Sequence, residues 1–286
     1  MNSVLTYLKG MLMGIADLIP GVSGGTIALI TGIYQRLINA IAALNWRVVR
    51  MFFRGRLKQA WQAIDGWFLL TLFAGILTAV FVFASLLSHL LSHYPQLTWA
   101  FFFGLIISAA VLILAKNLST QPLNWLFLLV GMLLGYALST QHLGVLPGGF
   151  TGVFLAGMIA ISAMILPGIS GSLILILLGK YQQILAAVED RQWLTLLTFA
   201  AGCVIGLMVF SRLLKWLLAH FYQATMYVLP GLMLGTLFKV WPWQLDGGNV
   251  MPWHHPEPQW LMMLLMMLSS SLLVVVLFKL DRTPDH

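Results

Sequence analysis

Charged residues are scarce in this 286-residue chain, because Asp, Glu, Lys and Arg together make up only 8% of it. Soluble domains carry about 25% charged residues, and one soluble core could not hide a composition that is 60% hydrophobic. Cysteine is almost absent as well, since Cys203 stands alone inside an apolar run. A single cysteine excludes a disulfide framework and a cysteine metal site. With a mean hydropathy of +0.93, the chain is predicted to lie in a bilayer.

The sequence also lacks the pattern of a removable signal peptide and that of a metal-binding cluster. The N-terminus lacks a basic region followed by a short apolar run and a cleavage site, so no removable signal is expected. His254, His255 and Glu257 lie close together, but the cluster is too short to predict a metal site. We therefore expect no metal, no cofactor and no nucleic-acid partner, although a coupling proton or sodium ion remains open.

The sequence contains an internal duplication. Residues 16–41 align with residues 163–188 without a gap at an offset of 147, and 10 of the 26 positions are identical. The identities include Gly32 and Gly179, Tyr34 and Tyr181, and Gln35 and Gln182. A second block, 75–104, aligns with 202–231 at an offset of 127, so the first copy carries 20 extra residues between the blocks.

Each copy is predicted to contain one broken helical unit and three membrane spans, giving an all-α polytopic fold. The broken units, near 5–43 and 153–188, are interrupted by Pro and Gly, which end helices. We expect the first repeat at 1–140, with a basic insertion at about 46–65, and the second at 141–286. The predicted spans, each near the roughly 20 residues that a bilayer requires, are 67–91, 97–115, 123–138, 194–218, 225–241 and 260–280.

The distribution of basic residues predicts the orientation of the chain. If the basic insertion is cytoplasmic, 12 of the 15 Lys and Arg residues fall inside, and Lys180, Arg191 and Lys239 fall outside. An odd number of spans separates the copies, so the second copy is predicted to be inverted. Both termini are then cytoplasmic, with the loops at 141–149 and 246–259 outside. The basic insertion is interpreted chiefly as a topology anchor that contacts anionic membrane lipids.

The Pro-Gly segments predict an anion site. Backbone without helical hydrogen bonds is tolerated at membrane depth only where protein buries it or a polar cavity adjoins it. Two such breaks in inverted repeats are expected to meet near the midplane. The free amides of a Ser-Gly turn that opens a helix then favour a phosphate or carboxylate. The alternative is that these small residues merely allow close helix packing.

Three stretches of the chain form a distinctive motif: Ile15-Ala16-Asp17-Leu18-Ile19-Pro20-Gly21-Val22-Ser23-Gly24-Gly25-Thr26, then Gly32-Ile33-Tyr34, and the repeated Pro167-Gly168-Ile169-Ser170-Gly171. With these residues the chain resembles the PopT family of bacterial polyprenyl-phosphate transporters. It implies a non-enzymatic protein of the bacterial cytoplasmic membrane that returns undecaprenyl phosphate from the outer to the inner leaflet for cell-envelope biogenesis. The alternatives are a membrane polyprenyl-pyrophosphate phosphatase and a non-transporting channel or scaffold.

The candidate substrate-binding residues follow from the motif and its repeat. They are Asp17, Pro20, Gly21, Ser23, Gly24, Gly25, Thr26, Pro167, Gly168, Ser170, Gly171, Ser172 and Lys180. Lys180 replaces Ile33 of the first copy and is interpreted as a counter-charge or as an interfacial lysine. Asp17 is replaced by Met164 in the second copy and is interpreted either as a helix cap or as the carrier of a coupling proton.

Overall fold

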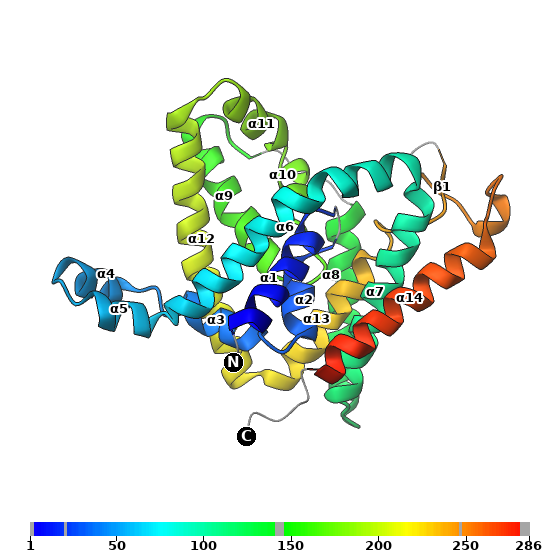
Figure 1. Cartoon of the computed structure of the whole chain (residues 1–286), viewed down its shortest axis with the longest axis horizontal. Helices are drawn as coiled ribbons and strands as arrows, with labels where there is room; N and C mark the ends of the chain where they lie inside the picture. The colour runs from blue at the N-terminus through cyan, green and yellow to red at the C-terminus, as the bar shows by residue number, and fades with distance from the viewer. Residues whose placement is uncertain (1–2, 20–21, 141–145, 246–247, 281–286) are drawn as a thin grey trace.

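The computed structural model describes residues 3–19, 22–140, 146–245 and 248–280. Over these residues the fold is all-α, apart from one short antiparallel strand pair and a 3-10 turn (Figure 1). The helices of the first half are α1 (Ser3–Asp17), α2 (Gly24–Ile30), α3 (Tyr34–Ala42), α4 (Trp46–Phe53), α5 (Leu57–Ala63), α6 (Gly66–His93), α7 (Pro95–Lys116) and α8 (Pro122–Thr140). Those of the second half are α9 (Gly149–Ile165), α10 (Gly171–Leu177), α11 (Tyr181–Glu189), α12 (Trp193–His220), α13 (Tyr222–Thr236) and α14 (Trp260–Leu280). The strands β1 (Gln244–Leu245) and β2 (Gly248–Asn249) and the turn η1 (Pro252–His254) separate the last two helices.

Five helices are long and apolar enough to cross a membrane. They are α6, α7, α8, α12 and α14, and they confirm five of the six predicted spans and the polytopic all-α class. The sixth span, predicted at 225–241, is instead the 15-residue helix α13. A helix of that length rises about 22 Å, which is less than the roughly 30 Å of a hydrocarbon core. It ends at Thr236 because the chain continues in tight turns, in which Leu237 N–H donates to Leu234 O and Lys239 N–H donates to Thr236 O.

The two halves repeat the same order of elements and the same packing. Helix α1 packs along α6, and α9 packs along α12. Gly75 on α6 lies against the carbonyl of Tyr7, and its repeat equivalent Gly202 on α12 lies against the carbonyl of Phe154. Tyr7 and Phe154 are themselves related by the offset of 147. Equivalent glycines thus bring equivalent helix pairs together, because a small residue lets two backbones approach closely.

The remaining helices pack in pairs, and each pair joins one helix from the first half with one from the second. Helix α7 packs against α14 from the second half, and α13 packs against α8 from the first half. Gly104 on α7 lies 2.6 Å, measured from an added Cβ, from the Met267 Cα on α14. Its repeat equivalent Gly231 on α13 lies against Gly131 of α8. The halves are therefore interlocked and share one large buried core.

Both broken units fold back on themselves as hairpins. In the first hairpin, the Lys9 ammonium in the middle of α1 donates to the Thr31 carbonyl, at 2.6 Å, just after α2. In the second hairpin, Leu146 N–H, just before α9, donates to the Leu178 carbonyl after α10. Each second helix therefore runs back toward the end of the molecule where the first helix began. In Figure 1, α1 begins at the lower end and α9 begins at the upper end, so the hairpins enter from opposite ends.

The equivalent residues Gly32 and Gly179 end the short helices α2 and α10. Both adopt a left-handed conformation, with φ of 70° and 65°, that glycine reaches without the steric cost of a side chain. The chain then turns sharply into α3 and α11. The bend between α10 and α11 is 111°. This shared turn explains why the identities of the repeat extend past the Pro-Gly segments.

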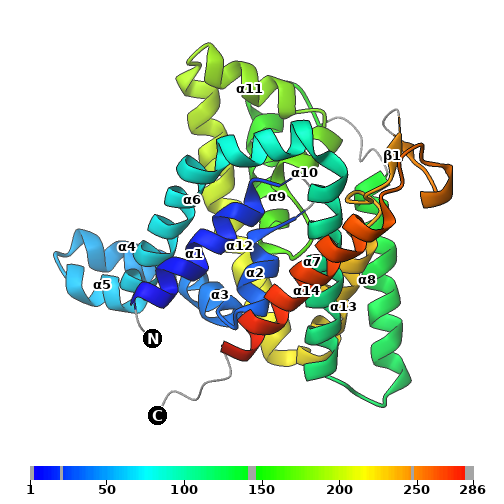
Figure 2. The ribbon, with the colours of Figure 1, turned by 45° about the vertical axis from the view of Figure 1, so that its right-hand side comes forward.

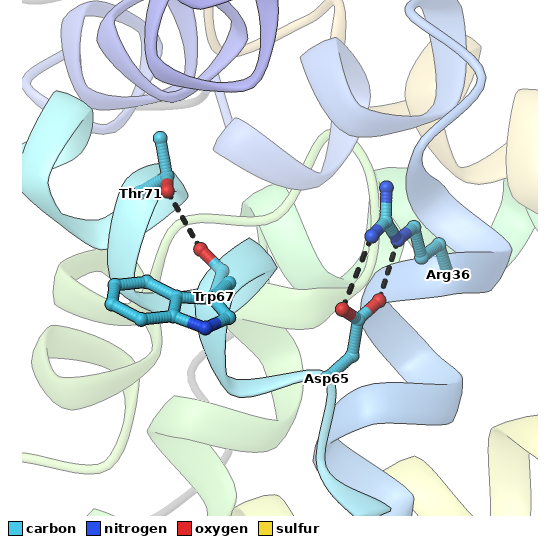
Figure 3. Close-up of polar contacts among 4 residues, drawn as sticks. All are labelled: Arg36, Asp65, Trp67 and Thr71. Carbon is cyan, nitrogen blue, oxygen red and sulfur yellow. Dashed lines mark hydrogen bonds and ion pairs between the residues drawn. The ribbon is translucent and has the colours of Figure 1, made fainter. Parts of the chain in front are cut away.

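The 20 extra residues of the first half form α4 and α5. In both views these helices project sideways at the lower end, near α3 and the start of α6 (Figures 1 and 2). An ion pair fixes the adjoining corner, since the Arg36 guanidinium of α3 contacts both carboxylate oxygens of Asp65, at 2.6 and 3.1 Å (Figure 3). Arg36 also lies 4.3 Å from the centre of the Phe68 ring. The lower end also contains most of the helices and helix ends that carry the predicted cytoplasmic charges (Figure 1). That this end faces the cytoplasm stays a prediction.

Candidate functional site

The two Pro-Gly breaks contact each other inside the protein. The Ser23 hydroxyl donates to the Met164 carbonyl at 2.9 Å, across 141 residues of sequence. In return, Gly168 N–H in the second break donates to the Thr26 hydroxyl at 3.0 Å. The Tyr34 hydroxyl donates to the Ile165 carbonyl at 3.2 Å. These bonds satisfy backbone carbonyls and amides that the broken helices leave without internal partners.

The first break is closed by its own side chains. Helix α1 ends at Asp17, whose Oδ1 accepts the Gly24 amide at 2.7 Å. Ser23 is the N-cap of α2, and its Oγ accepts the Gly25 amide at 3.0 Å. A Cβ on Gly24 would lie only 2.6 Å from the other Asp17 oxygen, so the carboxylate fits against this backbone because no side chain intervenes. The positive end of α2 is thus occupied by a carboxylate of the protein.

The second break is open in comparison. Met164 stands where the first copy has Asp17, and the side chain of the N-cap Ser170 makes no capping bond. The Ser170 and Ser172 hydroxyls hydrogen-bond to each other at 2.8 Å. Among the described residues, no acceptor is recorded for the amides of Gly171 and Ser172. The start of α10 therefore offers two amides and two hydroxyls that no carboxylate of the described chain occupies.

A cavity of about 310 Å³ lies at this opening. Its polar wall consists of Asp17 from the first hairpin and Ser170, Gly171 and Ser172 from the second. Ser172 is exposed, so the cavity reaches the surface of the protein beside α10. The rest of the wall is formed by α9, α10 and α12, through Ala160, Ile161, Met164, Leu175, Phe199 and Cys203. The cavity is thus apolar except where the two hairpins meet.

The structure distributes the predicted site residues over four places, of which Lys180 occupies the last. Asp17, Ser170, Gly171 and Ser172 share the cavity. A second group, buried behind Asp17, holds the two breaks together; it consists of Ser23, Gly24, Gly25 and Thr26. Pro167 and Gly168 form the turn of the second break, where a Cβ on Gly168 would lie 2.9 Å from Met233 of α13. Pro20 and Gly21 lie outside the described residues.

Lys180 does not line the cavity. It is the N-cap residue of α11 and is separated from Ser170 by the whole of the seven-residue helix α10. Its side chain is buried, and the ammonium donates to the Gln183 side-chain oxygen at 3.1 Å. The repeated turn at Gly179 carries Lys180 to the upper end of the second hairpin, away from the break.

Sequence reasoning did not assign three residues to this region. Phe199 and Cys203 of α12 form part of the cavity wall, and Cys203 is half-buried there rather than enclosed in a core. Tyr34 joins the first hairpin to the second break. Its identity with Tyr181 marked it as a repeated residue, but the sequence carried no sign of its partner at Ile165. The sequence did not indicate that Phe199 and Cys203 line a cavity, because nothing distinguishes them from the other apolar residues of a long span.

Five membrane-length helices, with two helical hairpins that meet beside a cavity, define a polytopic membrane protein with the build of a transporter. Residues 13–252 match the VCA0040-like family, described as undecaprenyl phosphate translocase-like, and the chain belongs to this family. The polyprenyl-phosphate transporter of Vibrio cholerae is 45% identical over 244 residues, covering 85% of this chain and 79% of that protein. The polyprenyl-phosphate transporter of Staphylococcus aureus is 32% identical over 256 residues, covering 83% and 86%. No solved structure matches the chain.

Proposed function

We propose that this protein carries undecaprenyl phosphate from the outer to the inner leaflet of the bacterial cytoplasmic membrane, where the lipid re-enters cell-envelope synthesis. The family description and the names of both relatives support a polyprenyl-phosphate cargo. The observation that carries the proposal is the cavity at the meeting point of the two hairpins, with the Gly171 and Ser172 amides and the paired Ser170 and Ser172 hydroxyls as donors. In this proposal the protein is a transporter and not an enzyme.

In this proposal the cavity holds the phosphate while the polyprenyl tail stays in the bilayer. A phosphate has several acceptor oxygens, and hydroxyls and backbone amides can donate to them without a buried cation. The apolar wall from α9 and α12 suits the first carbons of the tail. Because Ser172 is exposed, the opening beside α10 lets the tail leave sideways into lipid. Only the headgroup then needs to cross through the protein.

In our proposal, Asp17 couples transport of the phosphate to a proton or a sodium ion. Its carboxylate lines the same cavity as the phosphate donors. Two anions in one small site repel each other, so that one of them favours neutralisation. A proton or a sodium ion on Asp17 would remove this repulsion when the phosphate binds. Asp17 therefore acts in our proposal both as the cap of α2, through its bond to Gly24, and as the coupling group.

The cavity does not favour the alternative of a phosphatase. Phosphoryl transfer requires a nucleophile with a base or metal-holding carboxylates, and a cation to stabilise the developing charge. Among the described residues, the lining contains one carboxylate, Asp17, and neither His nor Arg. Cys203 also lines the cavity, but no His, Lys or Arg accompanies it in that lining. Binding and release of an intact phosphate fit this set of residues better than hydrolysis.

A leaflet-resolved assay tests the proposal. Liposomes with labelled undecaprenyl phosphate in one leaflet, and with or without the reconstituted protein, are probed for the label on the opposite face. We expect the label to appear there only when the protein is present, without release of inorganic phosphate. Release of inorganic phosphate would establish the phosphatase alternative, and no transfer with correctly inserted protein would contradict transport.

A further inference from the structure

A second, polar cavity lies at the lower end of the molecule, below the first hairpin. Its volume is about 130 Å³, and it is enclosed by the ends of α2, α7, α12 and α14 and the starts of α3 and α13. Its polar lining consists of Tyr34, Gln35, Lys116, Asn117 and Tyr222. It shares no lining residue with the cavity at Ser170. The lower cavity is therefore a separate site.

The side chains of the lower cavity suit a small anion. Lys116 supplies an ammonium group, Gln35 supplies amide N–H groups, and Tyr222 supplies a hydroxyl. One amide N–H of Asn117 donates to the Ile113 carbonyl at 2.7 Å, so Asn117 supplies its second N–H. None of the Asp and Glu residues in the described ranges belongs to the lining. The ammonium of Lys116 lies 5.6 Å from the centre of the Phe278 ring. A volume of this kind of about 10–15 Å³ is enough for one water molecule, so the cavity has room for several waters or for a headgroup of phosphate size.

Tyr34 connects the lower cavity to the meeting point of the hairpins. It lines the cavity, and its hydroxyl donates to the Ile165 carbonyl of the second break at 3.2 Å. The left-handed turn at Gly32 places Tyr34 at the first position of α3, directly below α2. The Tyr34 side chain thus links the lower cavity to the backbone of the second break.

The lower cavity lies at the end of the molecule where the helices with most of the predicted cytoplasmic charges come together, since Lys116 ends α7 there. In the proposed direction of transport, this is the end at which the headgroup arrives.

We infer that the lower cavity is a second phosphate-binding site, at which Lys116, Gln35 and Asn117 receive the headgroup of a lipid monophosphate after it leaves the hairpin cavity. This inference rests on the proposed function and adds the end point of the path. The ammonium supplies the charge, and the two amides orient the phosphate oxygens. Tyr34 lies between the two sites.

Protection from thiol labelling tests the inference on the full-length protein in detergent. The reporter is Leu29→Cys, at a partly buried residue of the cavity lining, in a Cys203→Ala background. The probe is farnesyl phosphate, and the measured quantity is the concentration that halves the maleimide labelling rate. We expect Lys116→Gln to raise this concentration tenfold or more, about the change expected when one hydrogen bond to a charged group is lost. Lys215→Gln, an exposed lysine of α12 outside the lining, is the matched control and should leave it unchanged.

The natural Cys203 separates this inference from the proposed function, because it lines the hairpin cavity. Protection of Cys203 by farnesyl phosphate without protection of Leu29→Cys would overturn the lower site and leave the transport proposal standing. Protection of neither cysteine would contradict both. Farnesol and inorganic phosphate are the controls for the ligand. Equal protection by farnesol would overturn a phosphate site, and equal protection by inorganic phosphate would overturn the assignment to a lipid.

Discussion

Removal of the Asp17 carboxylate tests whether this residue holds the first break together. Gly24 is buried, and its amide donates to Asp17 at 2.7 Å. Asp17→Ala leaves that amide without its acceptor, which costs about 1–3 kcal/mol of unfolding free energy. Asp17→Asn keeps a carbonyl oxygen in the same place, and since Asn and Asp are near-equal caps the loss should stay below about 1 kcal/mol.

Asp65 provides the matched control for this prediction. It pairs with Arg36, but the two side chains are 39% and 40% exposed, and surface pairs contribute only about 0–1 kcal/mol. SDS titration in mixed micelles unfolds each variant and gives its unfolding free energy. We expect Asp17→Ala to lose clearly more stability than Asp65→Ala, and Asp17→Asn to lose no more than the control. An Asp17→Ala variant as stable as Asp65→Ala would refute the capping role.

The same variants separate capping from coupling. If transport requires a proton on Asp17, the wild-type rate falls as pH rises, because the carboxyl group loses that proton. Asp17→Asn is permanently neutral, so its rate should stay flat across the same pH range. The measurement is the leaflet-transfer rate in liposomes at a series of pH values, with and without sodium. An unchanged rate with an unchanged pH and sodium dependence would remove Asp17 from the coupling mechanism.

Further predictions concern the phosphate donors, the orientation and the basic insertion. Ser170→Ala and Ser172→Ala should each weaken phosphate binding by roughly 1–2 kcal/mol, with the double variant clearly worse in the liposome assay; a double variant at the wild-type rate would exclude the hydroxyls. For orientation, a membrane-impermeant maleimide added from the periplasmic side should label Asn249→Cys but not Gln59→Cys, and the reverse pattern would contradict the assigned topology. Neutralising the basic residues of α4 and α5 should weaken association of the protein with anionic vesicles more than with neutral ones, whereas an equal effect on both would remove the proposed lipid contact.

Much of the architecture could be predicted from the sequence, because membrane constraints act locally. A run of apolar residues must form a helix in lipid, so the composition identified five spans correctly. The duplication identified both broken units, since Pro and Gly interrupt each unit at the same place. The sixth span was predicted too long, because apolar residues after Thr236 continue in turns rather than in a helix. Local composition cannot distinguish those two outcomes.

The sequence by itself determined that this is a duplicated, all-α membrane protein with two broken helices carrying Ser-Gly turns. Only the tertiary structure decided that the broken units fold back as hairpins, that the breaks bond to each other, and that the two turns are not equivalent. Asp17 fills the start of α2 through Gly24, whereas Met164 leaves the start of α10 open to a cavity. The physical reason is that these partners lie on different helices, some more than 100 residues apart. Their contacts arise from packing of the whole chain, which no local pattern of residues specifies.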